Sequence, residues 1–178
     1  MFSKSEIVLS PNPVLREPCE QVTSFDKELK KLSERMLKAM YKTGGVGLAA
    51  PQIGVSKRLI VVDCDYDEQD RNPLVLVNPE LVEHSDEQYL GPEGCLSIPG
   101  VCFEIPRYTW VKVRAQDLEG SFFELEADEG LFNRCLQHEI DHTNGITMFE
   151  RLDPAQRMQA LRLYQEALAA GAKPGDVD

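Results

Sequence analysis

The sequence predicts an α+β protein, with strands in the middle of the chain and helices on both sides of them. Three observations predict this class: an amphipathic helical pattern near the start, strand-like runs between residues 58 and 127, and two helical patterns after residue 129. The 178 residues are 42% hydrophobic and 28% charged, which suits one globular domain with a substantial core. We therefore expect residues 1–178 to form a single domain.

Residues 26–41 predict the first helix, because their hydrophobic side chains recur with a helical period. Gly44 and Gly45 follow this pattern and indicate where the helix ends. The side chains that would face the core are Leu29, Leu32, Met36, Leu37 and Met40.

Four later runs are rich in β-branched and hydrophobic residues and predict strands: residues 58–63, 74–78, 109–115 and 121–127. A turn at residues 117–120 would join the last two. Pro92 and Pro99 bracket Cys95, and we expect a rigid irregular segment there. His84 is expected in a solvated loop.

Two more helices are predicted in the last third of the chain. The first covers residues 129–144 and ends at Gly145, which can adopt a left-handed C-cap. Asp153 and Pro154 are typical of the N-cap and first residue of the second. The tail after it, about residues 171–178, is expected to fray. The core-facing side chains of this last helix would be Met158, Leu161 and Leu168.

The most informative pattern is the run Gln-His-Glu-Ile-Asp-His at residues 137–142. Positions four apart lie on one face of a helix, so His138 and His142 can bind one metal ion, while Glu139 is placed to transfer protons without being a ligand. A catalytic site needs a third protein ligand and an open position for water. We favour Cys95 as this ligand. A zinc protease would instead recruit a downstream carboxylate, for which the candidates are Glu150, Asp153 and Glu166.

Charge and composition exclude several other functions. The formal net charge of −11 argues against a phosphate-binding surface, so we expect no direct nucleic-acid binding. Five cysteines at irregular spacing, with no Cys-x-x-Cys pair, favour a reducing compartment. The start of the chain lacks the apolar region of a signal peptide, and no apolar run approaches the roughly 18 residues of a membrane span. We therefore expect a soluble cytoplasmic protein without membrane contact.

Three motifs follow one another along the chain. They are Gly-Val-Gly-Leu-Ala-Ala-Pro-Gln at residues 45–52, Glu-Gly-Cys-Leu-Ser at residues 93–97 and the helical motif at residues 137–142. A lone H-E-x-x-H occurs in many hydrolases, but these three motifs in this order resemble the peptide deformylases. Those enzymes remove the formyl group from the N-terminal methionine of new bacterial and organellar proteins. The resemblance extends from Pro11 to Phe149.

This resemblance implies a mixed or antiparallel sheet wrapped around a central helix that carries the metal motif. It also implies one divalent metal ion, iron(II) in the cell, with zinc, nickel or cobalt accepted in vitro; a thiolate with two imidazoles suits any of them. The implied site residues are Cys95, His138 and His142 as metal ligands, Glu139 as acid and base, Gln52 and Leu96 as oxyanion donors, and Gly47 as a backbone contact to the substrate.

The implied substrates are N-formylmethionyl peptides or nascent chains, from which hydrolysis releases formate. We expect a monomer that contacts the ribosome transiently. Asp141 and Arg107 would form a pair that steadies the metal helix from outside the ligand set. An apolar slot for the methionine side chain would be lined by Ile53, Leu131 and Cys135.

Some positions depart from the family, and two other functions stay open. Thr143 stands where leucine is usual, Asn133 where alanine is usual and Phe103 where glycine is common, which bears on the shape of the pocket. A zinc endopeptidase would keep its metal after replacement of Cys95. A non-catalytic metal-stapled module, closed by a fourth protein ligand, would keep its function after replacement of Glu139.

Overall fold

The computed structural model describes residues 6–65, 67 and 69–176, and within these residues it has the predicted α+β fold. One antiparallel sheet has the strand order β1-β2-β3-β6-β7, and a separate hairpin pairs β4 with β5. The bounds of the strands are β1 Gly47–Ala49, β2 Leu59–Val62, β3 Leu74–His84, β4 Gln88–Cys95, β5 Ile98–Tyr108, β6 Trp110–Gln116 and β7 Phe122–Asp128. The helices are α1 Lys27–Lys42, α2 Leu131–Thr143 and α3 Pro154–Ala169.

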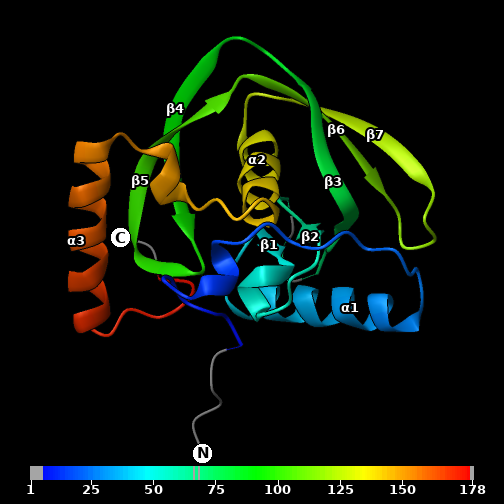
Figure 1. Ribbon diagram of the computed structural model, residues 1–178, viewed down its shortest axis with the longest axis horizontal. Helices are drawn as coiled ribbons and strands as arrows, with labels where there is room; N and C mark the ends of the chain where they lie inside the picture. Colours follow the sequence, from blue (N-terminus) through cyan, green and yellow to red (C-terminus); the bar gives the residue numbers. More distant parts are fainter. Residues whose placement is uncertain (1–5, 66, 68, 177–178) are drawn as a thin grey trace, which may run out of the picture.

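Helix α2 lies at the centre of the molecule, with the strands around it, α1 below and α3 at the outer side of the hairpin (Figure 1). Sheet and hairpin therefore wrap around α2, as expected. No helix in the described part of the chain has the length and apolar character that a membrane span needs.

The first helix begins and ends where its sequence predicts. The Asp26 carboxylate accepts hydrogen bonds from the backbone N–H groups of Glu28 and Leu29, both at 3.0 Å, which satisfies donors that the first turn leaves free. At the other end Gly44 has φ +68°, a left-handed conformation that favours glycine. Leu29, Met36 and Met40 are buried, so the apolar stripe faces the core.

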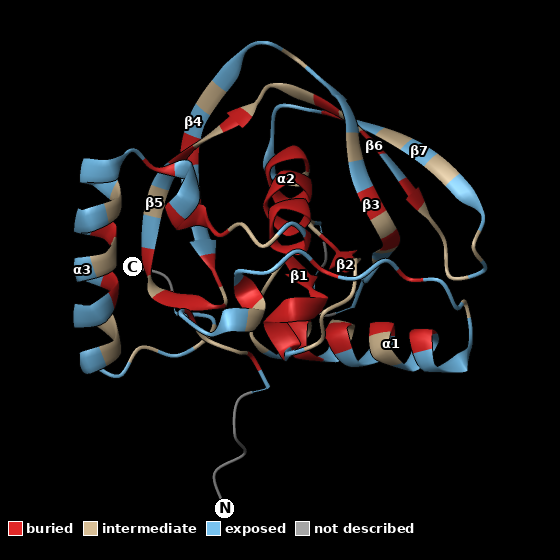
Figure 2. Cartoon of the chain, viewed as in Figure 1, coloured by how far each residue is buried: buried red, intermediate tan, exposed pale blue. Residues whose placement is uncertain are grey.

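Strand β2 runs through the centre of the core, and its side chains are buried on both faces. Leu59 and Val61 join the cluster that contains the buried face of α1, whereas Ile60 and Val62 join the cluster that contains α2. The sheet therefore separates two helices, and both of its faces are covered near β2 (Figure 2). This explains why the run is continuously hydrophobic and does not alternate.

Helix α2 is buried from Asn133 to Thr143, so its polar side chains need partners inside the protein (Figure 2). The amide of Asn133 donates to the carbonyl of Ala127 at 2.8 Å, and the hydroxyl of Thr143 donates to the carbonyl of Ile140 at 2.7 Å. Both side chains are therefore accommodated by local hydrogen bonds. Phe103, which was also expected to affect the shape of the pocket, is half-buried, and its ring centre lies 6.3 Å from that of Phe149.

Several expectations about individual residues are wrong. Cys95 does not lie in an irregular segment, because it is the last residue of β4, followed by a two-residue turn into β5. His84 is exposed but ends β3, where its ring stacks on that of Tyr108 with centres 3.8 Å apart. Met158 is 75% exposed, whereas Ala160 and Tyr164 form the buried face of α3.

The tail was expected to fray, but residues 171–176 are held against the rest of the protein. The backbone N–H of Ala172 donates to Ala167 at 3.0 Å, and that of Gly100 in β5 donates to the carbonyl of Asp176 at 2.9 Å. Residues 177 and 178 lie outside the described residues.

Candidate metal centre

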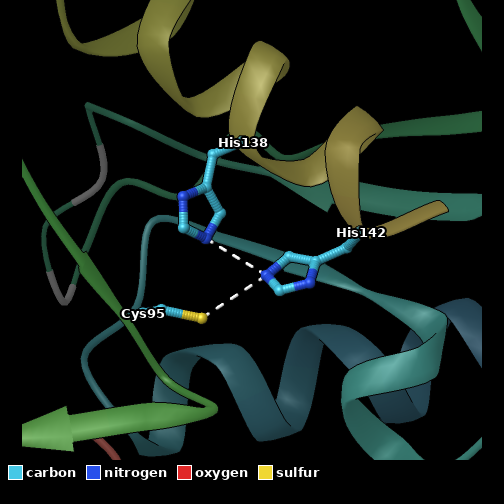
Figure 3. A group of neighbouring side chains, drawn as sticks. All are labelled: Cys95, His138 and His142. Carbon is cyan, nitrogen blue, oxygen red and sulfur yellow. Dashed lines mark hydrogen bonds between the residues drawn. The ribbon is translucent and has the colours of Figure 1, made fainter. Parts of the chain in front are cut away.

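The strand end of β4 and one face of α2 bring three potential ligands together. His142 Nε2 lies 3.2 Å from His138 Nε2 and 3.4 Å from Cys95 Sγ (Figure 3). One ligand atom from each residue lies within 4.8 Å of the others, and all three residues are buried. The i, i+4 spacing on α2 aligns the two imidazoles, and the hairpin turn brings the thiol to them.

The donor set fits a divalent transition-metal ion, because a sulfur and two imidazole nitrogens converge on one point. The carboxylates that a protease would recruit are engaged elsewhere. Glu150 accepts a hydrogen bond from the Thr147 hydroxyl at 2.7 Å, Asp153 caps α3, and Glu166 pairs with Arg162 at 3.1 Å. Among the described residues, none of these carboxylates belongs to the ligand cluster.

A buried carboxylate, Glu93, orients one of the two imidazoles. Its Oε2 lies 2.8 Å from His138 Nδ1. With Nδ1 bonded to the carboxylate, Nε2 of the same ring presents its lone pair to the ligand cluster. Burial alone would raise the pKa of Glu93, but hydrogen bonds from Arg107 and His138 hold that pKa well below its ordinary value. Glu93 is therefore ionised and accepts the hydrogen bond of His138 Nδ1.

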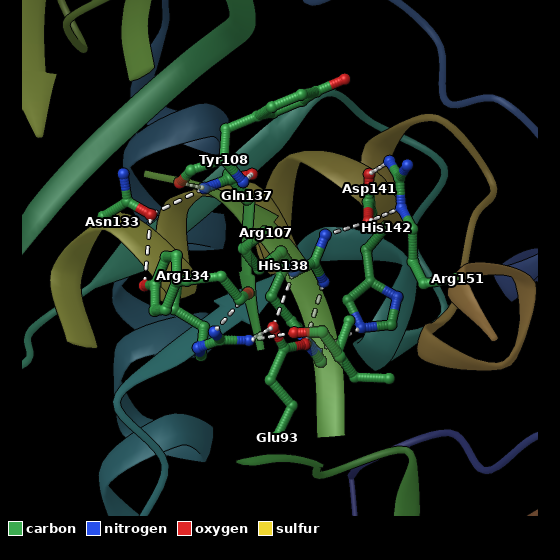
Figure 4. Close-up of polar contacts among 12 residues, drawn as sticks. Glu93, Arg107, Tyr108, Asn133, Arg134, Gln137, His138, Asp141, His142 and Arg151 are labelled. Carbon is green, nitrogen blue, oxygen red and sulfur yellow. Dashed lines mark hydrogen bonds and ion pairs between the residues drawn. The ribbon is translucent and has the colours of Figure 1, made fainter. Parts of the chain in front are cut away.

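Two arginines neutralise Glu93 and connect it to both α2 and β5 (Figure 4). Arg107 Nε donates to Glu93 Oε1 at 2.6 Å, and Arg134 Nη1 donates to the same oxygen at 2.9 Å. Arg107 also contacts Asp141 Oδ2 at 2.6 Å, so the expected pair of Asp141 and Arg107 is confirmed. Arg151 completes the network through its own contacts to Asp141. These buried charges are mutually paired and fix the hairpin to the metal helix.

A cavity of about 230 Å³ is lined by two of the three ligands, Cys95 and His138. Glu139 lies in its lining, and burial raises the pKa of this carboxyl to about 7. Among the described residues, Glu139 Oε2 and His142 Nδ1 are the buried side-chain atoms without a hydrogen-bond partner. An unpartnered carboxylate oxygen in a cavity wall can bind water or a substrate N–H group.

Gln52 is buried beside the ligand cluster with its amide orientation fixed. Its Oε1 accepts a hydrogen bond from the backbone N–H of Ala49 at 2.9 Å. Its Nε2 is therefore directed to the other side, 3.6 Å from Cys95 Sγ and 3.3 Å from Ser97 Oγ. Leu96, in the turn after β4, also lines the cavity.

Gly47 forms part of the opposite wall, on β1. A Cβ atom there would lie 2.5 Å from Cys135 Sγ and 2.7 Å from Glu139 Oε1, so only glycine fits without displacing them. Of the residues expected around a methionine side chain, Leu131 and Cys135 line the cavity. Ile53 does not line the cavity, because it belongs to the core cluster that also contains the buried face of α1.

Sequence reasoning missed two members of this site, Glu93 and Arg134, although the sequence holds a signal for each. Arg134 precedes His138 by four residues and so lies on the same helical stripe as the ligands. Glu93 precedes Cys95 by two residues, which places both side chains on one face of β4.

Comparison with known proteins gives one consistent result. The model of the family described as polypeptide deformylase matches residues 4–158. The peptide deformylase of Acidobacterium capsulatum is 44% identical over 165 residues, which cover 93% of this chain and 96% of that one. Peptide deformylase 1 of Bacillus cereus is 50% identical over 79% of this chain and 87% of its own length. The crystal structure of a peptide deformylase from Legionella pneumophila superposes with a TM-score of 0.84 at 42% identity, covering 93% of this chain and 96% of that one.

Proposed function

The chain belongs to the polypeptide deformylase family, and on that premise we propose which of its residues carry out the family's reaction. The protein is a metal-dependent hydrolase that removes the N-formyl group from the N-terminal methionine of newly made proteins. One observation supports the assignment of residues above all others: the thiol of Cys95 and the imidazoles of His138 and His142 converge beside a cavity into which Glu139 projects.

Cys95, His138 and His142 are proposed to hold the metal ion, with Glu93 fixing the ring of His138 from behind. A bound divalent ion supplies Lewis-acid polarisation of the formyl oxygen and makes water acidic enough to react near neutral pH. We propose iron(II) as the ion in the cell, as the resemblance implies, while zinc, nickel and cobalt suit the same donors.

Glu139 is proposed to transfer the proton. It takes a proton from the attacking water and returns it to the amine nitrogen of the departing methionine, which leaves formate and a free amino terminus. Its position supports this role, because Oε2 is buried in the cavity wall without another hydrogen-bond partner among the described residues.

Gln52 and Leu96 are proposed to stabilise the negative charge that collects on the formyl oxygen. The Gln52 amide is already directed toward the ligand cluster, because Ala49 holds its oxygen on the far side. The backbone N–H of Leu96 would be the second donor. A donor of this kind contributes about 2.7–4 kcal/mol to transition-state stabilisation in hydrolases.

Substrate selection would follow from the shape of the cavity. A formyl carbon carries only hydrogen, so a narrow space beside the ligands admits it and excludes an acetyl group. Gly47 is proposed to contact the peptide through its backbone, and Leu131 and Cys135 to contact the methionine side chain.

The domain organisation, compartment, oligomeric state and ribosome contact are proposals as well. We infer that residues 1–178 act as one catalytic domain in the cytoplasm, as a monomer that meets nascent chains through transient contact with the ribosome. The net charge of −11 supports the absence of direct nucleic-acid binding.

The test of these roles measures formate release from formyl-Met-Ala-Ser by anaerobically purified, metal-loaded protein. The variant Glu139→Ala should keep its metal and lose turnover, whereas Cys95→Ser and His138→Ala should lose metal. His84→Ala is the matched control, because His84 is exposed and lies outside the ligand cluster. Full turnover by Glu139→Ala, or full metal content in His138→Ala, would contradict the assignment.

A further inference from the structure

The last described residues of the chain return to the catalytic cavity. We call residues 171–176, which follow α3, the C-terminal strap. Gly175 and Asp176 of the strap line the same cavity as Cys95 and Glu139. The roles proposed above leave the strap without a function.

One end of the strap is attached to the hairpin. The backbone N–H of Gly100 in β5 donates to the carbonyl of Asp176 at 2.9 Å. Gly100 has φ +76°, and a Cβ there would lie 2.7 Å from Cβ of Ala172 and 2.9 Å from Cβ of Ala167. The hairpin backbone therefore packs directly on the strap and on the end of α3, which limits the positions that the strap can take.

The strap also reaches the residue that ends α1. Gly175 has φ +99°, and a Cβ there would lie 2.5 Å from the carbonyl oxygen of Thr43. Thr43 and Gly44 also line the cavity. The strap therefore contacts both the hairpin and the end of α1 beside the cavity.

A tight turn fixes the Asp176 side chain. Its Oδ2 accepts a hydrogen bond from the backbone N–H of Lys173 at 2.7 Å, and its own backbone N–H donates to the carbonyl of Lys173 at 2.9 Å. Asp176 belongs to none of the ion pairs among the described residues. Lys173, three residues before it in the chain, does not line the cavity.

The other charges of the cavity wall are either paired or belong to the metal centre. Glu93 is bonded to Arg134 at 2.9 Å, while His138 and Glu139 surround the ligand cluster. Asp176 is therefore the acidic side chain of the described lining that is neither paired with an arginine nor assigned to the metal centre.

We propose that Asp176 determines specificity: its carboxylate favours formyl peptides with a basic third or fourth residue and disfavours those with an acidic one. The proposal rests on the deformylase function, because the formyl group must reach the ligand cluster while the rest of the peptide extends along the cavity. An extended chain advances about 3.3 Å per residue, so residues three and four lie roughly 7–10 Å beyond the first. Because Asp176 lines the same cavity as Cys95 and His138, a peptide that extends along this cavity can bring these residues near its carboxylate.

The expected effect is modest, because Asp176 is exposed. Two unit charges about 8 Å apart in water change an equilibrium by roughly two- to threefold. Exchange of lysine for glutamate reverses the sign of the interaction, so the ratio of kcat/KM between matched peptides should be about fivefold. Salt should reduce this ratio, since an exposed charge is screened.

The experiment measures kcat/KM of the metal-loaded protein, residues 1–178, on formyl-Met-Ala-Lys against formyl-Met-Ala-Glu, and on formyl-Met-Ala-Ser-Lys against formyl-Met-Ala-Ser-Glu. The variant Asp176→Asn should remove most of the preference for lysine, and its residual ratio should match that of the unmodified enzyme in 1 M salt. Asparagine can still accept the hydrogen bond from Lys173, so the turn is retained. Glu119→Gln removes the same charge from the exposed turn between β6 and β7 and should leave the ratio unchanged.

Equal ratios for the unmodified enzyme and Asp176→Asn at both peptide positions, with formyl-Met-Ala still hydrolysed, would overturn this inference alone. Absence of formate from formyl-Met-Ala would overturn the proposed function and this inference with it. An equal loss of preference in Glu119→Gln would assign the effect to net charge and would also overturn the role of Asp176.

Discussion

Replacement of Gly47 by alanine should impair the proton-transfer residue while leaving the metal in place. A Cβ atom at this position would lie 2.5 Å from Cys135 Sγ, 2.7 Å from Glu139 Oε1 and 2.9 Å from Glu139 Cγ. None of these three nearest atoms belongs to a metal ligand. The substitution therefore perturbs Glu139 by direct contact without changing any polar group.

The size of the effect follows from the displacement that is needed. Contacts of this kind are ordinarily at least 3.4 Å long, so a carboxylate oxygen at 2.7 Å must retreat by about 0.7 Å. A misplacement of about 1 Å in a catalytic geometry costs on the order of 100-fold in rate. We therefore expect kcat to fall by roughly 30- to 100-fold. Crowding of the buried wall should also cost about 1–3 kcal/mol of unfolding free energy.

The assay combines steady-state formate release, metal content and thermal denaturation. Gly45→Ala is the control in the same wall, because a Cβ there meets Leu96 Cδ1 at 2.7 Å, the end of a flexible side chain that can rotate away. It should retain activity within a few-fold. If Gly47→Ala keeps its metal and turns over as fast as Gly45→Ala, then Glu139 does not need its observed position and the argument fails.

Three further predictions concern stability and metal binding. Glu93→Gln leaves Arg107 and Arg134 buried without their shared anion and should cost about 3–5 kcal/mol, or roughly 10 °C in Tm; a loss below 1 kcal/mol in denaturant titration would contradict this. Tyr164→Phe removes the hydrogen bond to the carbonyl of Ser10 (2.9 Å) and should cost about 1 kcal/mol at pH 7. Because burial and the nearby Cys95 raise the pKa of Tyr164 to about 12, from about 10 in the unfolded chain, the unmodified protein should lose stability as pH rises from 10 to 12, and Tyr164→Phe should lose less. Removal of the metal by a chelator should lower Tm, and added zinc or cobalt should restore it; an unchanged Tm in a calorimetric scan would argue against a bound ion.

The helices were predictable because their signals are local. At the starts of α1 and α3, the side chains of Asp26 and Asp153 accept hydrogen bonds from backbone N–H groups of the first turn. Just after α2, Gly145 adopts the left-handed conformation that favours glycine. The hairpin of β4 and β5 was not predictable in the same way, because Pro92, Pro99 and neighbouring glycines interrupt its alternation. Prolines are tolerated there because a two-stranded ribbon has free edges on both sides.

The metal ligands could be proposed from the sequence because two of them share one helical turn and the third lies in a motif. Of the ion network behind them, the sequence suggested only the pair of Asp141 and Arg107, since the other contacts depend on how β4, β5 and α2 approach one another. Only the fold shows that Arg107 also lies 2.6 Å from Glu93 and that Arg134 shares this carboxylate. The core face of α3 was predicted in part: Leu161 and Leu168 pack against the cluster that contains Ala160 and Tyr164, whereas Met158 is exposed.

The glycines of the wall formed by residues 44–47 affect the range of peptide sequences that the enzyme can accept. Gly44, Gly45 and Gly47 present peptide backbone to the cavity where other residues would present side chains. Every polypeptide carries the same amide groups whatever its gene encodes. A surface of this kind can dock any extended chain by its repeating unit, which lets a single catalyst serve an entire proteome.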